Sequence, residues 1–385
     1  MSTTPPIRIF FPGRLVFGNG CLTEAAEEIT RLAPSRVLVI TIEPLLSSLV
    51  GLMARLEDSG IRVCVYTRIV QEPSFADFYT VMKEAAPFDP DLVLGIGGGS
   101  VLDVAKLVAA QLGNDQALAD YVGNGLLKGR RRGLICMPAT SGTGSEVSPN
   151  AILVDDADGQ KKGIISPYLV PDSVYVDPLL TRSVPPSVTA ATGLDALTHC
   201  LEAYTNRFAQ PFIDLYAFEG MRLLSGYLVR AVTDGSDEEA RSQVAMGSLL
   251  GGFCLGPVNT AAVHALSYPL GSLFHLPHGL SNALLLPYVM EFNLPAAPAR
   301  FARVAEALGC ARGKDDVATA LDGVEKIRSL IRECGLPSTL KEVGVPFDAI
   351  GGMAADAMKI TRLLVNNPRP VTPEDAVDIY TKAYE

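Results

Sequence analysis

The chain has 385 residues, of which 48% are hydrophobic and 19% are charged, and its formal net charge at neutral pH is −10. This composition is typical of a folded globular protein and excludes a disordered or fibrous chain, while the negative charge argues against nucleic acid or an anionic membrane as a partner. The length is sufficient for two domains, because a single hydrophobic core seldom grows beyond about 250–300 residues.

Cysteine usage and the N-terminus indicate the compartment. The seven cysteines include no Cys-x-x-Cys pair, which favours reduced thiols over a disulfide framework or a zinc knuckle. The opening MSTTPPIRIFF lacks a basic segment followed by an apolar core, so no signal peptide is expected. No uncharged apolar run approaches the roughly 18 residues that a membrane-spanning helix needs. We therefore expect a cytoplasmic protein.

The first half of the chain alternates strand and helix patterns. RVLVIT (36–41), IRVCVYT (61–67), DLVLGIGGGS (91–100) and GLICMPAT (133–140) are short apolar runs typical of strands. LLSSLVGLMARLEDSG (45–60) and VLDVAKLVAAQL (101–112) have helical periodicity and lie between them. Strands alternating with helices of this length predict a parallel sheet built from βαβ units.

From about residue 185 the pattern becomes helical. PSVTAATGLDALTHCLEAYTN, FIDLYAFEGMRLLSGYLVRAV and EEARSQVAMGSLLGGFCL follow one another, and prolines mark the junction in VDPLLTRSVPPS. The expected fold is therefore an α/β N-terminal domain with a parallel, Rossmann-like sheet over residues 1–184, followed by an all-α C-terminal domain over 185–385.

Two glycine-containing turns end predicted strands. Gly97, Gly98 and Gly99 separate a strand from a helix, where Ser100 and Asp103 predict a capping-box-like pair. Bare glycines and a helix N-terminus suit a phosphate group, and both turns would lie at the ligand-binding edge of an open α/β sheet. A simple tight connection is the alternative for each turn. The second turn, PATSGTGSE, offers the hydroxyl groups of Thr140, Ser141, Thr143 and Ser145.

Three of the four histidines lie within residues 264–278, and the fourth, His199, follows Asp195 by four positions. A carboxylate and an imidazole one helical turn apart form half of a divalent metal site. With His264 and His278 they would make an oxygen and nitrogen donor set suited to Fe²⁺ or Zn²⁺. Each histidine taken alone is equally compatible with an ordinary core or surface role, and spacing cannot bring the two segments together.

The motifs GGGSVLDVAK, PATSGTGSEVSPNAIL, GLDALTHCLEAYTN, HALSYPLGSLFHLPHGLSNALLLPYVMEFN and LLVNNPRPVTPEDAVDIY resemble the iron-containing (group III) alcohol dehydrogenase family. The resemblance covers nearly the whole chain in the right order. It implies a dinucleotide-binding domain followed by a helical domain, an architecture shared with dehydroquinate synthase. It also implies that Asp195, His199, His264 and His278 bind the metal.

The resemblance further implies which residues contact the nicotinamide cofactor. They are Gly97, Gly98, Gly99, Ser100, Asp103, Thr140, Thr143, Ser145, Asn150 and Lys162. A solvated surface lysine is the alternative for Lys162. Many members that prefer NAD have an aspartate where this chain has Ile42, with Glu43 next, so the choice between NAD and NADP stays open.

A second departure concerns proton transfer. The family often has a histidine at the position of Tyr268. Tyr268 could relay a proton through its hydroxyl group or merely pack, and His275 could substitute for it or be an ordinary surface residue.

We therefore predict a metal-dependent alcohol dehydrogenase that transfers a hydride between a primary or small secondary alcohol, or the corresponding aldehyde or ketone, and NAD or NADP. The alternatives are a metal-independent reductase similar to maleylacetate reductase and a lyase similar to dehydroquinate synthase. The intact aspartate and three histidines argue against the first. The expected partner is a small-molecule substrate, and the expected assembly is a homodimer.

Overall fold

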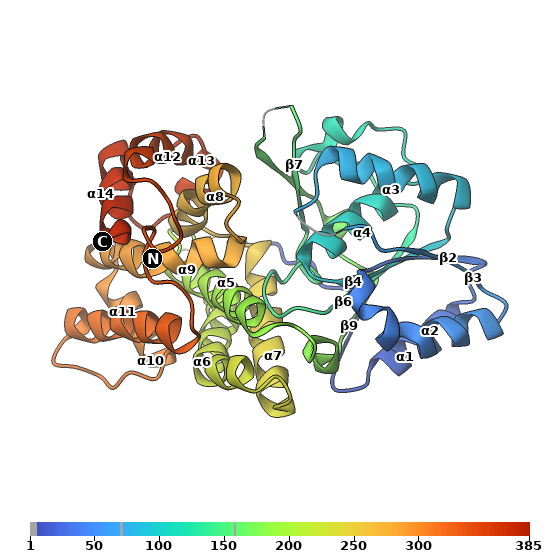
Figure 1. Cartoon of the computed structure of the whole chain (residues 1–385), viewed down its shortest axis with the longest axis horizontal. Helices are drawn as coiled ribbons and strands as arrows, with labels where there is room; N and C mark the ends of the chain where they lie inside the picture. Colours follow the sequence, from blue (N-terminus) through green and yellow to red (C-terminus); the bar gives the residue numbers. More distant parts are fainter. Residues whose placement is uncertain (1–5, 70–71, 158) are drawn as a thin grey trace. The chain divides into compact units, whose positions relative to one another are not determined.

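The structure is a computed structural model that describes residues 6–69, 72–157 and 159–385, and it divides into two compact units (Figure 1). The α/β unit comprises Ile9–Thr140 and Gly144–Ser183. The helical unit comprises Val184–Glu385 with short pieces that include Ser141–Thr143. No helix in the described ranges is both long enough and apolar enough to cross a membrane.

The α/β unit alternates strands and helices along most of its length. Its elements are β1 (Arg14–Phe17), α1 (Leu22–Leu32), β2 (Arg36–Ile40), α2 (Leu46–Asp58), β3 (Arg62–Tyr66), α3 (Phe75–Phe88), β4 (Leu92–Gly97), α4 (Gly99–Gln111), β5 (Gly123–Asn124), β6 (Gly133–Pro138), β7 (Asn150–Val154), β8 (Lys161–Ile165) and β9 (Ser173–Val176).

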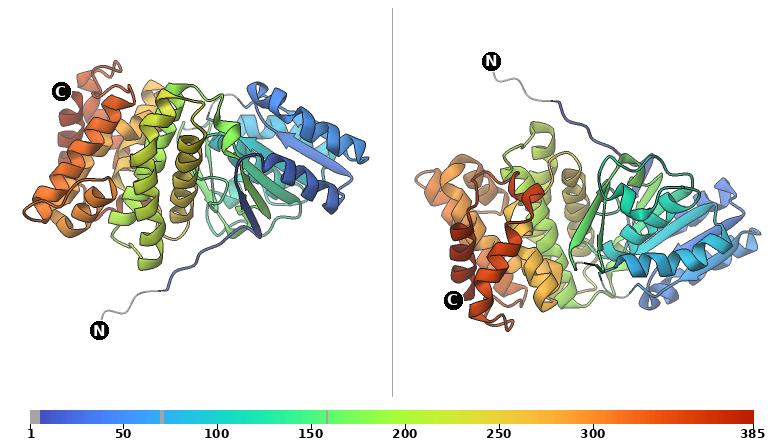
Figure 2. Two further views of the ribbon diagram at one scale, coloured as in Figure 1. Left: turned by 90° about the horizontal axis from the view of Figure 1, so that it is seen from below. Right: turned by 90° about the horizontal axis from the view of Figure 1, so that it is seen from above.

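Six of these strands form one parallel sheet in the order β1-β9-β6-β4-β2-β3. Side chains along β2 alternate between its two faces, as the pleat requires. Leu38 and Ile40 pack in a core with α3 and α4, whereas Val37 and Val39 pack in a core with α1 and α2. Both faces are therefore covered by helices (Figure 2), which explains why the inner strands β4 and β6 are almost wholly apolar.

A second, three-stranded sheet has the order β5-β8-β7. β7 and β8 pair antiparallel, with Asn150 opposite Ile165. This hairpin was not expected from the sequence, which has only mixed polar and apolar residues there.

The helical unit contains α5 (Pro186–Thr205), α6 (Pro211–Thr233), α7 (Glu238–Leu255), α8 (Ala262–Phe274), α9 (His278–Asn293), α10 (Pro298–Ala307), α11 (Asp316–Glu333), α12 (Ile350–Ala357), α13 (Thr361–Leu364) and α14 (Pro373–Tyr384). The expected fold class, an α/β part with a parallel sheet followed by a helical part, is confirmed.

Helix α5 is the central element of this unit and is buried along nearly all of its length. α6, α7 and α9 all contact it. The approach of α6 is close enough that a Cβ atom on Gly220 would lie 2.5 Å from Cys200 Sγ. Functional side chains on α5 are therefore held in a dry, closely packed environment.

Candidate active site

The loop after β4 lies at a switch point of the parallel sheet. The chain runs from β2 outward to β3 and then returns to place β4, β6 and β9 on the other side of β2. Open α/β sheets bind ligands beside the carboxyl ends of the strands at such a point. The glycine-rich loop predicted from the sequence is therefore at the position where a dinucleotide is expected.

This loop leads directly into α4, whose N-cap is Gly98 and whose first residue is Gly99. No side chain caps the helix, so the backbone N–H groups of its first turn are suited to an anionic ligand. A Cβ atom on Gly98 would lie 3.4 Å from Thr140 Oγ1. The two predicted glycine-containing loops therefore lie side by side.

The predicted capping pair of Ser100 and Asp103 is wrong. α4 begins one residue before Ser100, so this serine lies inside the first turn and cannot cap it. Asp103 instead accepts hydrogen bonds from Ser145 Oγ at 2.5 Å and from the Ile152 N–H at 2.9 Å. Both carboxylate oxygens have partners within the protein, and Asp103 ties α4 to the loop that follows β6.

Lys106 belongs to the same cluster and was not predicted. It is fully buried on α4, and its Nζ donates to the Ser145 carbonyl at 2.7 Å, to Ser145 Oγ at 3.0 Å and to the Asn150 carbonyl. Burial lowers the pKa of Lys106 and raises the pKa of Asp103, while the attraction between the two charges opposes both shifts. The sequence feature that could have revealed Lys106 is its position inside the mostly apolar run VLDVAKLVAAQL.

The other predicted cofactor contacts are more dispersed. Asn150 opens β7, and its Oδ1 is buried with no hydrogen-bond partner among the residues described. Such a group is costly without a partner, which makes it a candidate contact for a bound molecule. Lys162 lies on β8 with Nζ 3.9 Å from Asp155 Oδ2, and Thr143 groups with the helical unit.

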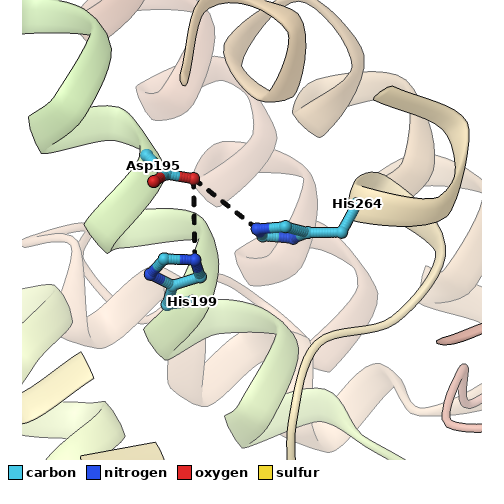
Figure 3. A group of neighbouring side chains, drawn as sticks. All are labelled: Asp195, His199 and His264. Atoms are coloured by element: carbon cyan, nitrogen blue, oxygen red, sulfur yellow. Dashed lines mark ion pairs between the residues drawn. The ribbon is translucent and has the colours of Figure 1, made fainter. Parts of the chain in front are cut away.

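In the helical unit, the ligand atoms of three predicted metal ligands, Asp195, His199 and His264, all lie within 4.8 Å of one another, and His278 approaches the same aspartate. Asp195 and His199 are one turn apart on α5, and Figure 3 shows them with His264 of α8. His278 is the first residue of α9. Asp195 Oδ1 lies 3.6, 3.5 and 3.7 Å from the Nε2 atoms of these three histidines in chain order.

These distances suit a shared divalent cation. Separations of 3.5–3.7 Å are too long for hydrogen bonds. Two ligands that are each about 2.1 Å from one tetrahedral ion lie roughly 3.4 Å from each other. One carboxylate oxygen with three imidazole nitrogens is a donor set that Fe²⁺ or Zn²⁺ accepts, so the residues present fit the metal expected from the sequence.

The electrostatics of the cluster also favour a cation. Burial lowers the pKa of His264, but the carboxylates of Glu202 and Asp195 outweigh burial and raise that pKa to about 10. Burial raises the pKa of Asp195, but the three imidazoles outweigh it and hold the pKa far below its ordinary range. Two buried carboxylates beside one imidazolium leave a net negative charge, which a divalent cation would neutralise.

Glu202 is a site residue that the sequence analysis missed. It is buried on α5, and its carboxylate lies 2.6 Å from His264 Nδ1 and accepts a 2.6 Å hydrogen bond from the Val263 N–H. When an ion takes the place of the Nε2 proton, Glu202 keeps the proton on Nδ1, which gives the tautomer that a metal ligand needs. The spacing of Asp195, His199 and Glu202, which places them on one helical face, could have revealed it.

Asn282 is the second missed residue. It is fully buried on α9, one turn after His278. Its Nδ2 lies 2.7 Å from Asp195 Oδ1, 3.1 Å from His264 Nε2 and 3.4 Å from His278 Nε2. Each Nε2 has a single lone pair, which a bound ion would take, so the contact that Asn282 keeps in a loaded site is its hydrogen bond to Asp195 Oδ1, which orients that carboxylate.

The two residues considered for proton transfer have different surroundings. The Tyr268 ring centroid lies 5.9 Å from that of His278, and the Tyr268 hydroxyl accepts a 3.1 Å hydrogen bond from Arg362 Nη2. His275 is exposed at the C-cap of α8, with a left-handed φ of 56°. The tyrosine therefore adjoins the ligand set, and the histidine marks the turn between α8 and α9.

Replacing Glu202 with glutamine is expected to lower the affinity for the metal by about 10- to 100-fold, as is usual when the partner of a ligating histidine is changed. The neutral amide no longer stabilises the proton on His264 Nδ1 and leaves one of the two former donors poorly paired. Competition with a chelator of known affinity measures the change. The control is Glu325→Gln at an exposed position of α11, which changes the net charge by the same amount away from the site. An unchanged affinity would show that Glu202 only holds the Val263 backbone and does not support His264 as a ligand.

Comparison with known proteins gives matches in both units. The family model for iron-containing alcohol dehydrogenase matches residues 12–178, and the model for the C-terminal part of the Fe-containing alcohol dehydrogenase family matches residues 189–384. Long-chain-alcohol dehydrogenase 1 of Geobacillus thermodenitrificans is 40% identical, over 98% of this chain and 96% of that protein.

Solved structures agree with these matches. A 1,3-propanediol oxidoreductase superposes with a TM-score of 0.95 at 30% identity, covering 99% of this chain and 100% of that one. Sulfoacetaldehyde reductase from Bifidobacterium kashiwanohense, in complex with NAD⁺, superposes with a TM-score of 0.87 at 28% identity, covering 98% and 99%. The protein belongs to the iron-containing alcohol dehydrogenase family and is an oxidoreductase that acts on the CH–OH group of alcohols.

Proposed function

We propose that this protein transfers a hydride between a primary or small secondary alcohol and NAD, with Fe²⁺ or alternatively Zn²⁺ held by Asp195, His199, His264 and His278. The observation that carries the proposal is the convergence of three imidazole Nε2 atoms on one carboxylate oxygen at 3.5–3.7 Å. Membership of an iron-containing dehydrogenase family supports the choice of metal.

A bound divalent ion would supply Lewis-acid polarisation of the alcohol or carbonyl oxygen. The protein's own residues hold and orient the reactants. Glu202 and Asn282 orient the ligand atoms, while the uncapped start of α4 is suited to the cofactor pyrophosphate. A bound nicotinamide would supply direct hydride exchange with the substrate carbon, so no side-chain nucleophile is needed. Tyr268, whose ring adjoins His278, is the proposed relay for the hydroxyl proton, and His275 is the alternative.

Two other reactions fit less well. A metal-independent reduction of the maleylacetate reductase kind would leave a buried aspartate and buried histidines without a task. A lyase of the dehydroquinate synthase kind is disfavoured because both halves of the chain match alcohol dehydrogenase models.

The nucleotide choice depends on the end of β2. Ile42 offers no hydrogen bond to a ribose hydroxyl and no charge to repel a 2′-phosphate, and Glu43 is already bonded to Thr67 Oγ1 at 2.6 Å. Arg68 forms a backbone β-bridge with Ile42, but its guanidinium is paired with the Glu84 carboxylate, so the strand end carries neither a free positive charge nor a repelling carboxylate at position 42. We propose that NAD is the main cofactor, in line with the NAD⁺ complex of the reductase described above, and that NADP is also accepted.

The test is hydride transfer followed by nicotinamide absorbance at roughly 340 nm with a panel of alcohols and aldehydes. Activity is expected with NAD, to be lost after metal is removed by a chelator, and to return with Fe²⁺ or Zn²⁺. NADP should support turnover with kcat/KM less than about ten-thousand-fold below that of NAD. Full activity in protein proven metal-free by elemental analysis would refute the metal site.

We infer that residues 1–184 form the dinucleotide-binding domain and residues 185–385 the metal and substrate domain, which the two compact units support. We also propose a cytoplasmic location, since all seven cysteines are unpaired. A homodimer stays the prediction for the assembled state.

A further inference from the structure

We propose that Arg362 is a specificity residue that binds an anionic group, a carboxylate or sulfonate, on the far end of the alcohol or aldehyde substrate. The inference rests on the proposed function, because it takes the four-ligand cluster of the helical unit as the place where the substrate oxygen reacts.

The first step is the direction from which a small molecule reaches that cluster. The side chains of Asp195, His199 and His264 are 3–6% exposed. The side chain of His278 is 27% exposed. Solvent therefore meets the ligand set along His278, and groups beside His278 are the ones that an incoming substrate passes.

Tyr268 and Arg362 lie on that side. The Tyr268 ring is 5.9 Å from the His278 ring, and Arg362 Nη2 donates to the Tyr268 hydroxyl at 3.1 Å. The guanidinium carbon is 5.7 Å from the centre of the same tyrosine ring. These contacts lead from half-buried His278 through Tyr268 to the exposed guanidinium of Arg362, and therefore outward from the ligand set.

Among the residues that the structure describes, the guanidinium of Arg362 has no acidic partner, although the chain carries a net charge of −10. In the parts of the chain that the structure describes, no ion pair involves Arg362. Arg300 and Arg328 of the same unit do form ion pairs, with carboxylate oxygens of Asp214 and Glu291 at 2.6 and 2.7 Å, whereas Arg332, like Arg362, forms none among the described residues. An exposed arginine has five N–H donors in a planar fork that matches carboxylate and sulfonate oxygens, and the contact with Tyr268 leaves most of them for a ligand.

A phosphate of the nucleotide is the other source of negative charge in this reaction, and one experiment separates the two sources. Butanal and succinic semialdehyde have the same carbon chain and differ in a terminal carboxylate. The metal-loaded enzyme reduces each with NADH, and kcat/KM is measured for the parent, Arg362→Gln and Arg362→Lys. The control is Arg332→Gln, which removes an exposed arginine from α11 and so changes the net charge of the protein by the same amount.

The ratio of kcat/KM for succinic semialdehyde to that for butanal is expected to fall about 30-fold in Arg362→Gln, the usual loss when a hydrogen-bonded ion pair is removed. The fall should come through KM, with butanal changed less than about 3-fold. Arg362→Lys should restore part of the ratio, because it keeps the charge without the fork, and Arg332→Gln should not change it. An unchanged ratio in Arg362→Gln overturns the proposal. A higher KM for NADH at a constant ratio overturns it in favour of a cofactor phosphate.

Equilibrium binding tests the proposal independently of turnover. Succinate should bind to the NADH-loaded parent in titration calorimetry, and Arg362→Gln should weaken it at least about 10-fold. If the parent reduces neither aldehyde but binds succinate through Arg362, the proposed function fails while the anion site stands. If succinate binds parent and variant equally, the anion site fails whatever the enzyme reduces.

Discussion

Asp195→Asn is expected to abolish metal binding and to lower kcat/KM by roughly four orders of magnitude, about 5.5 kcal/mol in the activation barrier. Asp195 Oδ1 is the atom on which the three imidazoles converge. A neutral amide oxygen is a far weaker ligand for a divalent ion, and the variant removes one of the two negative charges that attract the ion. The metal content after dialysis, by elemental analysis, and the rate of alcohol oxidation measure the two effects.

The fold and the affinity for NADH should survive this substitution. Asparagine has the shape of aspartate and removes a buried charge, and the glycine loop that opens α4 belongs to the α/β unit. NADH fluorescence and the melting temperature check both points. The control is Asp378→Asn at an exposed position of α14, which removes the same charge away from the site. A variant that keeps one ion per chain and turns over at the parent rate would show that Asp195 is not a ligand.

Gly279→Ala is expected to destabilise the protein by about 3 kcal/mol, the upper part of the range for overpacking a close contact, and to release the metal. A Cβ atom at this position would lie 2.2 Å from the Ala191 carbonyl oxygen and 2.6 Å from its carbon. Both atoms are backbone of α5, so the start of α9 must move away. His278 directly precedes Gly279, and its distance from Asp195 would increase.

Urea unfolding and elemental analysis measure the two effects of Gly279→Ala. Gly226→Ala is the matched control, because Gly226 is an exposed residue within α6 whose Cβ would meet nothing within 4 Å. That variant should be more stable by about 0.5–1 kcal/mol, because alanine favours a helix interior. A Gly279→Ala protein with parent stability and a full metal content would contradict the close contact between α9 and α5.

Much of the α/β unit could be predicted from local patterns. The strands that became β2, β4 and β6 were recognisable because both faces of the sheet are buried there, which makes these segments nearly continuously apolar. The edge strand β3 is only partly buried and was recognisable from its β-branched residues. The hairpin of β7 and β8 was not recognisable, because its residues are only partly buried and its polar and apolar positions are mixed. The capping pair at Ser100 was wrong by two residues, because the N-cap is Gly98 and glycine needs no side chain to start the helix.

The sequence by itself determined the features that depend on neighbours along the chain. These are the glycine loop that opens α4 and the i, i+4 pair of Asp195 and His199, since helical periodicity fixes the direction of such a pair. Only the tertiary structure decided that His264 and His278 meet this pair, because close packing at small residues such as Gly279 sets the distance between α5 and the helices that follow. It also decided the roles of Glu202 and Asn282, whose side chains became part of the site because helices distant in sequence bury them against the ligands and leave those ligands as their hydrogen-bond partners.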